Sequence, residues 1–260
     1  MTRTVLDSSL APFWFFFIPI LGLVFGSFAT ALIARVPIKE SLWTRSKCPH
    51  CAREILPQEN IPVISFLLLK GKCRGCESKI SVSYPLTELS MAALFIAPFI
   101  FPNTQNEITL WVIFSIFALP LTVIDIKLHR LPDILTGSLF LTSFVVILVM
   151  SVSHHAYDRL APSVVGAVAL AAFYFAIALI SKGGMGLGDV KLSASVGLVS
   201  GYFGLNAVFV SSFAAFFCGS LIGLFLMAAK KANRKTPIPF GPFMILGQYV
   251  CFIGVALKLL

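Results

Sequence analysis

Residues 207–229 read AVFVSSFAAFFCGSLIGLFLMAA and contain no charged side chain. A helix needs about 20 predominantly apolar residues to cross the hydrocarbon layer of a membrane, because each residue adds about 1.5 Å to its length. Residues 13–34 and 134–152 are similar stretches, and neither contains a charge. These stretches therefore predict helices that span a membrane.

The composition of the whole chain supports the same conclusion. Of the 260 residues, 58% are hydrophobic and 12% are charged, with a mean hydropathy of +0.93. Soluble domains are about half apolar and about one quarter charged, so a water-soluble fold is excluded. We expect an all-α polytopic membrane protein with about eight spans. They are residues 13–34, 85–101, 109–126, 133–153, 161–180, 190–204, 207–229 and 237–258.

The sixth span is short and contains Gly197 and Gly201, which predicts that it is either tilted or packed tightly against small residues of its neighbours. The net charge of +9 follows the positive-inside rule, because an N-terminus outside the cell puts 17 of the 20 basic residues on the cytoplasmic side. The C-terminus then also lies outside. The positive charge therefore indicates membrane topology and gives no reason to expect a nucleic-acid partner.

The largest polar region, residues 35–84, contains the pattern C-x2-C-x21-C-x2-C. Its cysteines are Cys48, Cys51, Cys73 and Cys76. Paired cysteines at this spacing can bring four thiolates together around zinc, although two disulfides are the alternative. The predicted topology places the loop in the reducing cytoplasm, which favours zinc. Because four thiolates leave no open coordination position, we expect the zinc to be structural.

Carboxylates within membrane segments are costly and are candidate functional residues by default. Asp125 ends the third predicted span, and Asp189 begins the sixth, so both lie at the cytoplasmic face. Two carboxylates in a low-dielectric environment tend to share one proton. One can then take a proton from an attacking water while the other polarises a carbonyl oxygen. This pair predicts aspartyl peptidase chemistry.

Nearby residues have simpler interpretations. Asp133 follows a proline at a predicted helix start, where an aspartate can cap free amides. Asp189 can also act as a helix cap, which is compatible with catalysis. The glycines that precede Asp189 let the backbone approach another chain closely, including an extended substrate; they are Gly183, Gly184, Gly186 and Gly188.

These motifs together resemble the type IV prepilin peptidases, a family of bifunctional leader peptidases and N-methyltransferases. The resemblance covers most of the chain. It lies in residues 26–37, 48–76, 81–88, 125–133, 186–192 and 238–243 (IPFGPF). One departure is Thr30, where the family usually has asparagine.

The resemblance implies that Asp125 and Asp189 are the catalytic pair. The substrates would be prepilins or type II secretion pseudopilins, cut after a glycine at the end of a short basic leader. The new N-terminal residue, usually phenylalanine, would then be methylated from S-adenosylmethionine, for which no sequence motif indicates a binding site. The implied location is the bacterial inner membrane, in contact with lipid.

The same resemblance predicts three functional regions along the chain. It assigns residues 1–34 to a first transmembrane helix, 35–84 to a cytoplasmic zinc domain associated with methylation, and 85–260 to a seven-helix peptidase domain. Pilin precursors carry an acidic residue shortly after the cut site, so a cation near the catalytic pair should contact it. Lys191 and Arg130 are the nearest candidates in sequence.

Two other functional classes fit the membrane location less well. Transporters also use intramembrane carboxylates, but they place them near the membrane midplane rather than at one face, and no inverted repeat is present in the sequence. A non-catalytic scaffold that docks partners through the cysteine loop would not require two aspartates in motifs of this kind.

Overall fold

The structure is a computed structural model that describes residues 11–101, 103–153, 155–181, 185–231, 233, 236 and 238–260. For residues 11–15 it describes the backbone only. The chain divides into two compact units, Met1–Ile100 and Phe101–Leu260. The described residues form helices and connecting segments and contain no β-strand, which confirms the all-α prediction.

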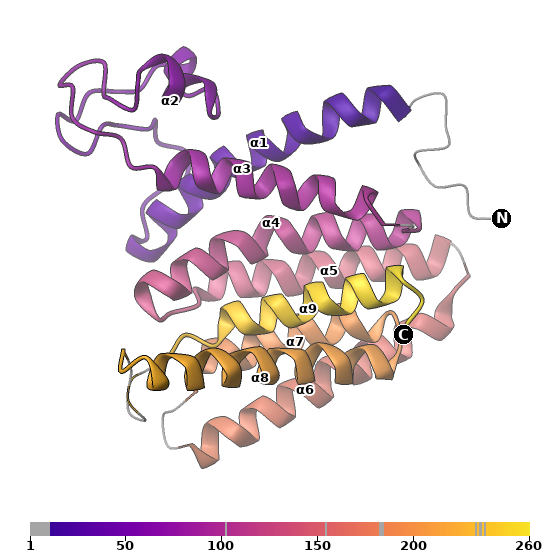
Figure 1. Ribbon diagram of the computed structural model, residues 1–260. Coiled ribbons are helices and arrows are strands. Elements are labelled where there is room, and N and C mark those ends of the chain that lie inside the picture. Colours follow the sequence, from indigo (N-terminus) through magenta and orange to yellow (C-terminus); the bar gives the residue numbers. More distant parts are fainter. Residues whose placement is uncertain are drawn as a thin grey trace. The chain divides into compact units, whose positions relative to one another are not determined.

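The first unit is built on two helices that pack side by side, α1 (Ala11–Arg35) and α3 (Ser83–Ile96) (Figure 1). Glycines in α1 allow this close packing. A Cβ atom added to Gly22 would lie 2.6 Å from the Cα of Ala92, and one added to Gly26 would lie 2.5 Å from the Cα of Glu88. Small residues of this kind let the backbones of membrane helices approach each other.

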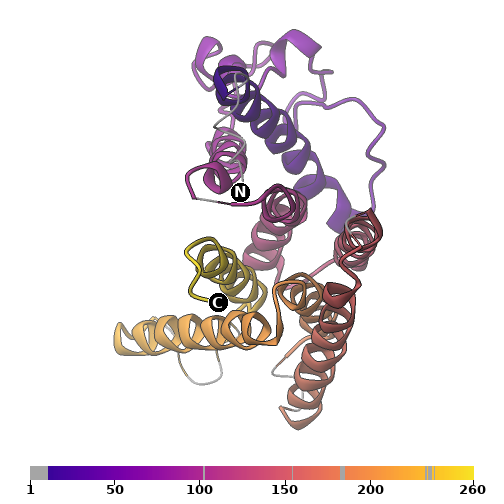
Figure 2. The same ribbon diagram turned by 90° about the vertical axis from the view of Figure 1, so that its right-hand side faces the viewer.

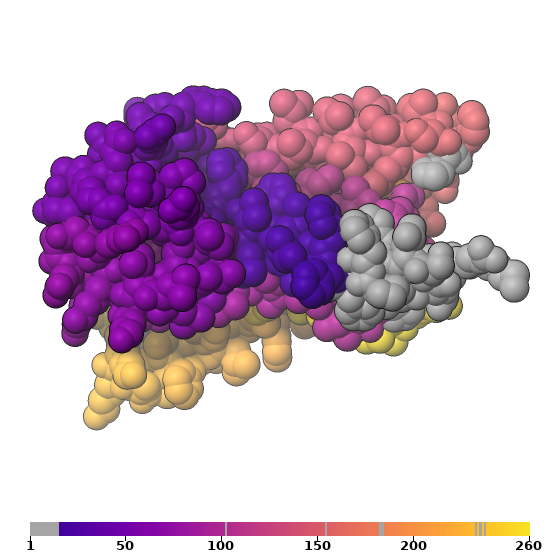
Figure 3. All heavy atoms as spheres, turned by 90° about the horizontal axis from the view of Figure 1, so that it is seen from above, coloured from indigo at the N-terminus to yellow at the C-terminus, as the bar shows by residue number. Residues whose placement is uncertain are grey.

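The segment between α1 and α3 forms a polar lobe at one end of the helix pair (Figure 3). It contains only short helices, which are η2 (Val36–Ile38), η3 (Pro57–Glu59) and α2 (Ile64–Leu68). After α3, the chain continues as η4 (Ala97–Phe99), which contains Pro98 and interrupts the α-helix.

The second unit is a helix bundle with α7 (Leu187–Gly201) at its centre. Its other helices are α4 (Gln105–Leu128), α5 (Asp133–Ser153), α6 (Leu160–Ile180), α8 (Leu205–Ala228) and α9 (Gly241–Ala256), with the short η5 (Tyr157–Arg159) before α6. α7 contacts α5, α6, α8 and α9, and its residues from Ser195 to Gly201 are all buried. α8 and α9 lie side by side (Figure 2).

The tight packing predicted for the sixth span occurs between α6 and α7. Gly166 and Gly197 face each other so closely that a Cβ atom on either would overlap the carbonyl oxygen of the other. Gly201 lies against the backbone of Pro162 and Ser163 in the same way. The prediction for Gly197 and Gly201 is confirmed.

Each of the eight predicted spans contains a helix, and five of these helices are long and apolar enough to cross a membrane on their own. α3, α7 and α9 have 14, 15 and 16 residues. At about 1.5 Å per residue, they are shorter than the roughly 30 Å of a hydrocarbon core. The multi-pass membrane prediction is confirmed, while the count of eight spans stays a prediction.

Candidate active site and metal centre

Asp125 lies in the last turn of α4, and only 4% of the residue is exposed. Its Oδ2 accepts a hydrogen bond of 3.0 Å from the backbone N–H of Gly241, the first residue of α9. The first amides of a helix have no partner within the helix, and they form the positive end of its dipole. The start of α9 therefore supplies the carboxylate of Asp125 with a donor and a favourable field.

Gly241 has little room for a side chain. A Cβ atom at this position would lie 2.7 Å from Oδ2 of Asp125 and 3.3 Å from the side chain of Leu131. A residue other than glycine would have to displace the carboxylate. This contact explains why a glycine stands in the middle of the IPFGPF segment.

Asp189 is the third residue of α7 and is half-buried. Its Oδ2 accepts a hydrogen bond of 3.1 Å from the backbone N–H of Gly186, the residue that precedes the helix. Asp189 therefore helps to cap α7, as the sequence suggested, although it does so from the third helical position. Its carboxylate interacts electrostatically with that of Asp125.

Leu131 packs between the helix ends that carry this pair, because it contacts both Gly188 of α7 and Gly241 of α9. It is buried, and Gly188 approaches it so closely that a Cβ atom on the glycine would lie 2.9 Å from its Cβ. Gly186 is exposed. The roles of Gly186 and Gly188 in substrate binding stay predictions, and Gly183 and Gly184 lie outside the described residues.

The two predicted substrate cations differ in their surroundings. Nζ of Lys191 donates a hydrogen bond of 2.7 Å to Oδ1 of Asp133, the first residue of α5. This ion pair is exposed and joins α5 to α7. Arg130, in the turn between α4 and α5, is exposed. These surroundings do not decide whether Lys191 or Arg130 contacts a substrate, so both assignments stay predictions.

The cysteine lobe contains two turns of the same design. In the first, the N–H of Cys48 donates to the carbonyl of Arg53 and that of Ala52 donates to the carbonyl of Cys48. In the second, the N–H of Cys73 donates to the carbonyl of Ser78, and Glu77 takes the place of Ala52. Ala52 and Glu77 both have a φ of 56°, so each turn closes through the left-handed conformation.

These turns bring together the four predicted metal ligands. The Sγ atoms of Cys48, Cys51, Cys73 and Cys76 all lie within 4.8 Å of one another. Those of Cys48 and Cys76 are 3.9 Å apart. Tetrahedral zinc with sulfur ligands at about 2.3 Å requires sulfur atoms about 3.8 Å apart, so the cluster has the spacing of a four-thiolate zinc site.

The environment of Cys48 also suits a metal-binding thiolate. The backbone N–H groups of Cys51 and His50 point at its sulfur and lower the pKa of the Cys48 thiol to about 6. Donors directed at a thiolate stabilise the charged form, which is the form that binds metal. His50 is exposed and does not belong to the cluster.

Two features of these sites were not assigned from the sequence. The Gly241 amide was not expected as the partner of Asp125, because the two residues are 116 positions apart. Glu88 was noted only as a carboxylate near the start of a span. It is 8% exposed and accepts a 2.7 Å hydrogen bond from the N–H of Val63, in the cysteine lobe. The sequence signal that could have identified Glu88 is that a carboxylate in a membrane segment is costly and is therefore a candidate functional residue.

Comparisons with known proteins place the two units in known families. Residues 20–101 match the family described as Bacterial Peptidase A24 N-terminal domain, which includes the cysteine lobe. Residues 112–227 match the Type IV leader peptidase family, and this match includes both Asp125 and Asp189. No solved structure matches the chain.

Curated relatives cover nearly the whole chain. A prepilin leader peptidase/N-methyltransferase of Bacillus subtilis is 34% identical over 90% of this chain and 92% of the relative. Proteins of the same name from Stutzerimonas stutzeri and Aeromonas hydrophila are each 32% identical, over 90% and 92% of this chain and 88% and 91% of the relatives. The chain therefore belongs to the type IV leader peptidase family.

Proposed function

We propose that this protein removes the leader peptides of type IV prepilins or type II secretion pseudopilins and then methylates the new N-terminal residue. The observation that carries the peptidase half is the packing of Leu131 against both Gly188, which precedes Asp189, and Gly241, whose amide donates to Asp125. The names of the relatives support both halves, because each combines leader peptidase with N-methyltransferase. The proposed location is the inner membrane, with the catalytic face towards the cytoplasm.

The surroundings of the two aspartates suit peptide hydrolysis. Each carboxylate uses Oδ2 to accept a backbone amide, from Gly241 or Gly186, so each is held in a fixed orientation. Oδ1 of the ionised aspartate then takes a proton from water as the water attacks the scissile carbonyl. The protonated aspartate donates to the carbonyl oxygen and later protonates the leaving amine. Aspartyl proteases divide the two roles in this way.

The cysteine cluster would hold one zinc ion through Cys48, Cys51, Cys73 and Cys76. A four-thiolate site is coordinatively closed, so zinc would stabilise the fold of the lobe and would not take part in the chemistry. The lobe contains little regular secondary structure, and metal binding would supply folding free energy that packing alone does not provide.

Methylation requires S-adenosylmethionine, which supplies an electrophilic methyl group when bound. Functionally, residues 35–84 would serve methylation and residues 85–260 would serve proteolysis, after a first transmembrane helix in residues 1–34. The compact units divide instead after Ile100, and this places α3 with the cysteine lobe. The proposed division concerns activity rather than packing.

The test is an assay of both activities with one substrate. Purified protein in detergent is incubated with a synthetic prepilin and S-adenosylmethionine, and mass spectrometry follows the product. We expect loss of the leader and a gain of about 14 daltons for one methyl group, because N-methylation replaces one hydrogen by CH₃. If the wild-type protein leaves the precursor intact under conditions where the protein stays folded, the peptidase proposal is wrong.

A further inference from the structure

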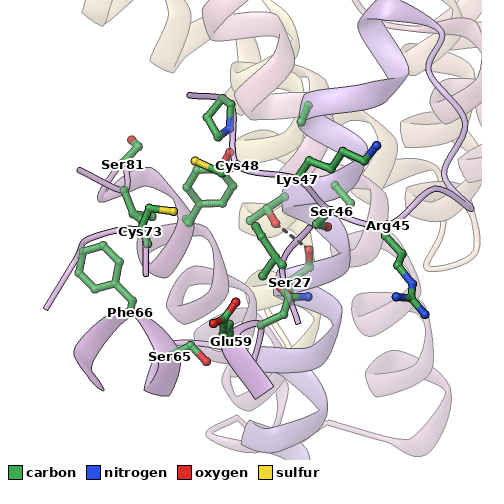
Figure 4. A pocket seen from close by; sticks show the side chains of 18 of the residues that line it. Ser27, Arg45, Ser46, Lys47, Cys48, Glu59, Ser65, Phe66, Cys73 and Ser81 are labelled. Carbon is green, nitrogen blue, oxygen red and sulfur yellow. Dashed lines mark hydrogen bonds between the residues drawn. The ribbon is translucent and has the colours of Figure 1, made fainter. Parts of the chain in front are cut away.

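The first unit contains a cavity of about 1270 Å³ between the C-terminal half of α1, the cysteine lobe and the start of α3. Figure 4 shows Ser27 from α1, Phe66 from α2, and Cys48 and Cys73 from the lobe around it. Binding sites for small molecules usually have about 300–1,000 Å³. This cavity is larger than that range.

Glu88 lies on the wall of this cavity and is fixed there by its neighbours. Gly26 of α1 lies directly against its backbone, its Oε2 accepts the N–H of Val63, and the hydroxyl of Ser27 donates to its carboxylate. Val63 holds its amide in position with a φ of 60°, which is strained for a β-branched residue. Strain of this kind persists where the surrounding structure enforces it, and it is concentrated at functional sites.

The charge of Glu88 is not balanced by a basic side chain within the part of the chain that the structure describes. Glu59 lines the same cavity, but it forms ion pairs with Arg53 at 2.8 Å and with Arg74 at 3.4 Å. Arg35 is also buried, and its guanidinium donates to the backbone carbonyls of Leu42 and Thr44. Among the described residues, no salt bridge involves Glu88.

The charged form of a buried carboxylate that has only neutral donors is costly, so such a group favours a bound cation or takes up a proton. The proposed methylation brings three cationic groups to the protein: the N-terminal ammonium group of the trimmed substrate, and the sulfonium and α-ammonium groups of the methyl donor. The sulfonium group has no N–H bond, whereas both ammonium groups can donate strong charge-assisted hydrogen bonds to a carboxylate. Of the two ammonium groups, only that of the substrate must lose a proton before it reacts, so a carboxylate that can accept a proton suits the substrate.

We propose that Glu88 binds the N-terminal ammonium group of the cleaved substrate and accepts its proton before methyl transfer. This inference rests on the proposed methyltransferase function. An ammonium group has no free electron pair, so it must lose a proton to react. Once Glu88 has taken that proton, the nitrogen lone pair forms the new N–C bond. The S–C bond of the donor breaks, and its electron pair stays on sulfur.

The test measures binding in the absence of any methyl donor. A labelled peptide that begins with phenylalanine is compared with its N-acetylated form on the purified full-length protein. We expect the wild type to bind the free amine about tenfold more tightly, because a charge-assisted hydrogen bond is lost on acetylation. Glu88→Gln, which keeps the shape and removes the charge, should bind both peptides equally. Retained discrimination by a folded Glu88→Gln protein would overturn the proposal.

Glu59→Gln is the matched control, because Glu59 lines the same cavity but is already paired with arginines. It should keep the preference for the free amine, and zinc content reports whether the lobe of each variant is folded. A second measurement uses only the wild type. A carbodiimide should couple the peptide amine to Glu88, as mapped by mass spectrometry, and coupling to Glu40 or Glu54 instead would contradict the proposal.

The methyltransferase function and the role of Glu88 can be tested separately. If the wild type transfers no methyl group from S-adenosylmethionine to the free-amine peptide, the methyltransferase proposal fails, whatever Glu88 does. If the wild type methylates the peptide and Glu88→Gln does so with unchanged kcat and KM, only the role of Glu88 is wrong.

Discussion

In the first unit, the four thiols come from two similar turns of one polar lobe, whereas in the second unit Asp125 and Asp189 come from the ends of two helices. Each pair of thiols comes from one short C-x2-C motif, and the two turns place all four sulfur atoms within 4.8 Å of one another. The aspartates meet only because α4, α7 and α9 pack correctly, with Gly241 and Gly186 supplying amide donors. The first site is formed by local turns that would be held together by the proposed zinc, whereas the second depends on the packing of the helix bundle.

This difference indicates that the two sites can be damaged independently. Loss of zinc should unfold the lobe and its cavity without removing a packing contact among α4, α7 and α9. A substitution at an aspartate should leave the lobe intact.

The largest effect is expected at the aspartates. Asp125→Asn or Asp189→Asn should reduce leader cleavage by about 10³-fold or more, because asparagine can neither accept nor share the proton. The double variant should be about as inactive as each single variant, since residues that act as a unit do not give additive losses. Rates are compared for equal amounts of membrane-inserted protein, with Asp133→Asn as a control that keeps substantial activity.

The second effect concerns the cysteines. The wild type should contain about one zinc ion per chain, and Cys48→Ser or Cys73→Ser should lower this content, because each cysteine supplies a quarter of the ligand set. Methylation should fall more than cleavage. Metal analysis of purified protein checks the content, and full zinc occupancy in the variant that lacks all four cysteines would exclude this site.

A third prediction tests how closely α9 fits against Asp125. Gly241→Ala should lower cleavage by roughly 10²-fold, because its Cβ atom would displace the carboxylate and small misplacements of catalytic groups are costly. Zinc content and methylation of a pre-cleaved peptide should not change. Gly137→Ala is the matched control, since a Cβ atom there meets nothing within 4 Å. Equal cleavage by the two variants would mean that the fit at Gly241 does not matter.

The smallest effects are expected at the two cations. Lys191 is already paired with Asp133, so Arg130→Glu should raise KM for the precursor more than Lys191→Glu does. An exposed ion pair contributes about 0.2–1 kcal/mol, which corresponds to changes of only a few-fold. Reversal of the acidic residue in the substrate should partly rescue the affected variant. If neither charge reversal alters cleavage, a different residue meets the substrate.

Much of the fold could be predicted from the sequence because long apolar stretches have one physical solution in a membrane. The helix lengths were harder to predict. Pro98 ends the α-helical part of α3, and α7 ends at Gly201, shortly before Gly204 adopts a φ of 120°. These local breaks shorten helices that hydropathy alone would extend.

The two sites also contain parts that could be predicted from the sequence and parts that could not. The clustering of the four cysteines was predictable because each C-x2-C pair is a local motif, and two such pairs typically converge on one site. The pairing of Lys191 with Asp133 and the amide of Gly241 at Asp125 were not, because these partners are 58 and 116 residues apart. Contacts between residues so far apart in the sequence depend on how the helices pack, and the pattern of a single sequence does not predict that packing.

The most direct test of the account crosses the two sites with the two activities. Asp125→Asn and Cys48→Ser are each incubated with intact precursor and with pre-cleaved peptide, and mass spectrometry records leader loss and methyl gain. We predict that Asp125→Asn methylates the pre-cleaved peptide but leaves the precursor uncut, while Cys48→Ser cuts the precursor but methylates poorly. Near-normal leader removal by Asp125→Asn would contradict the central claim that the aspartate pair is the peptidase centre.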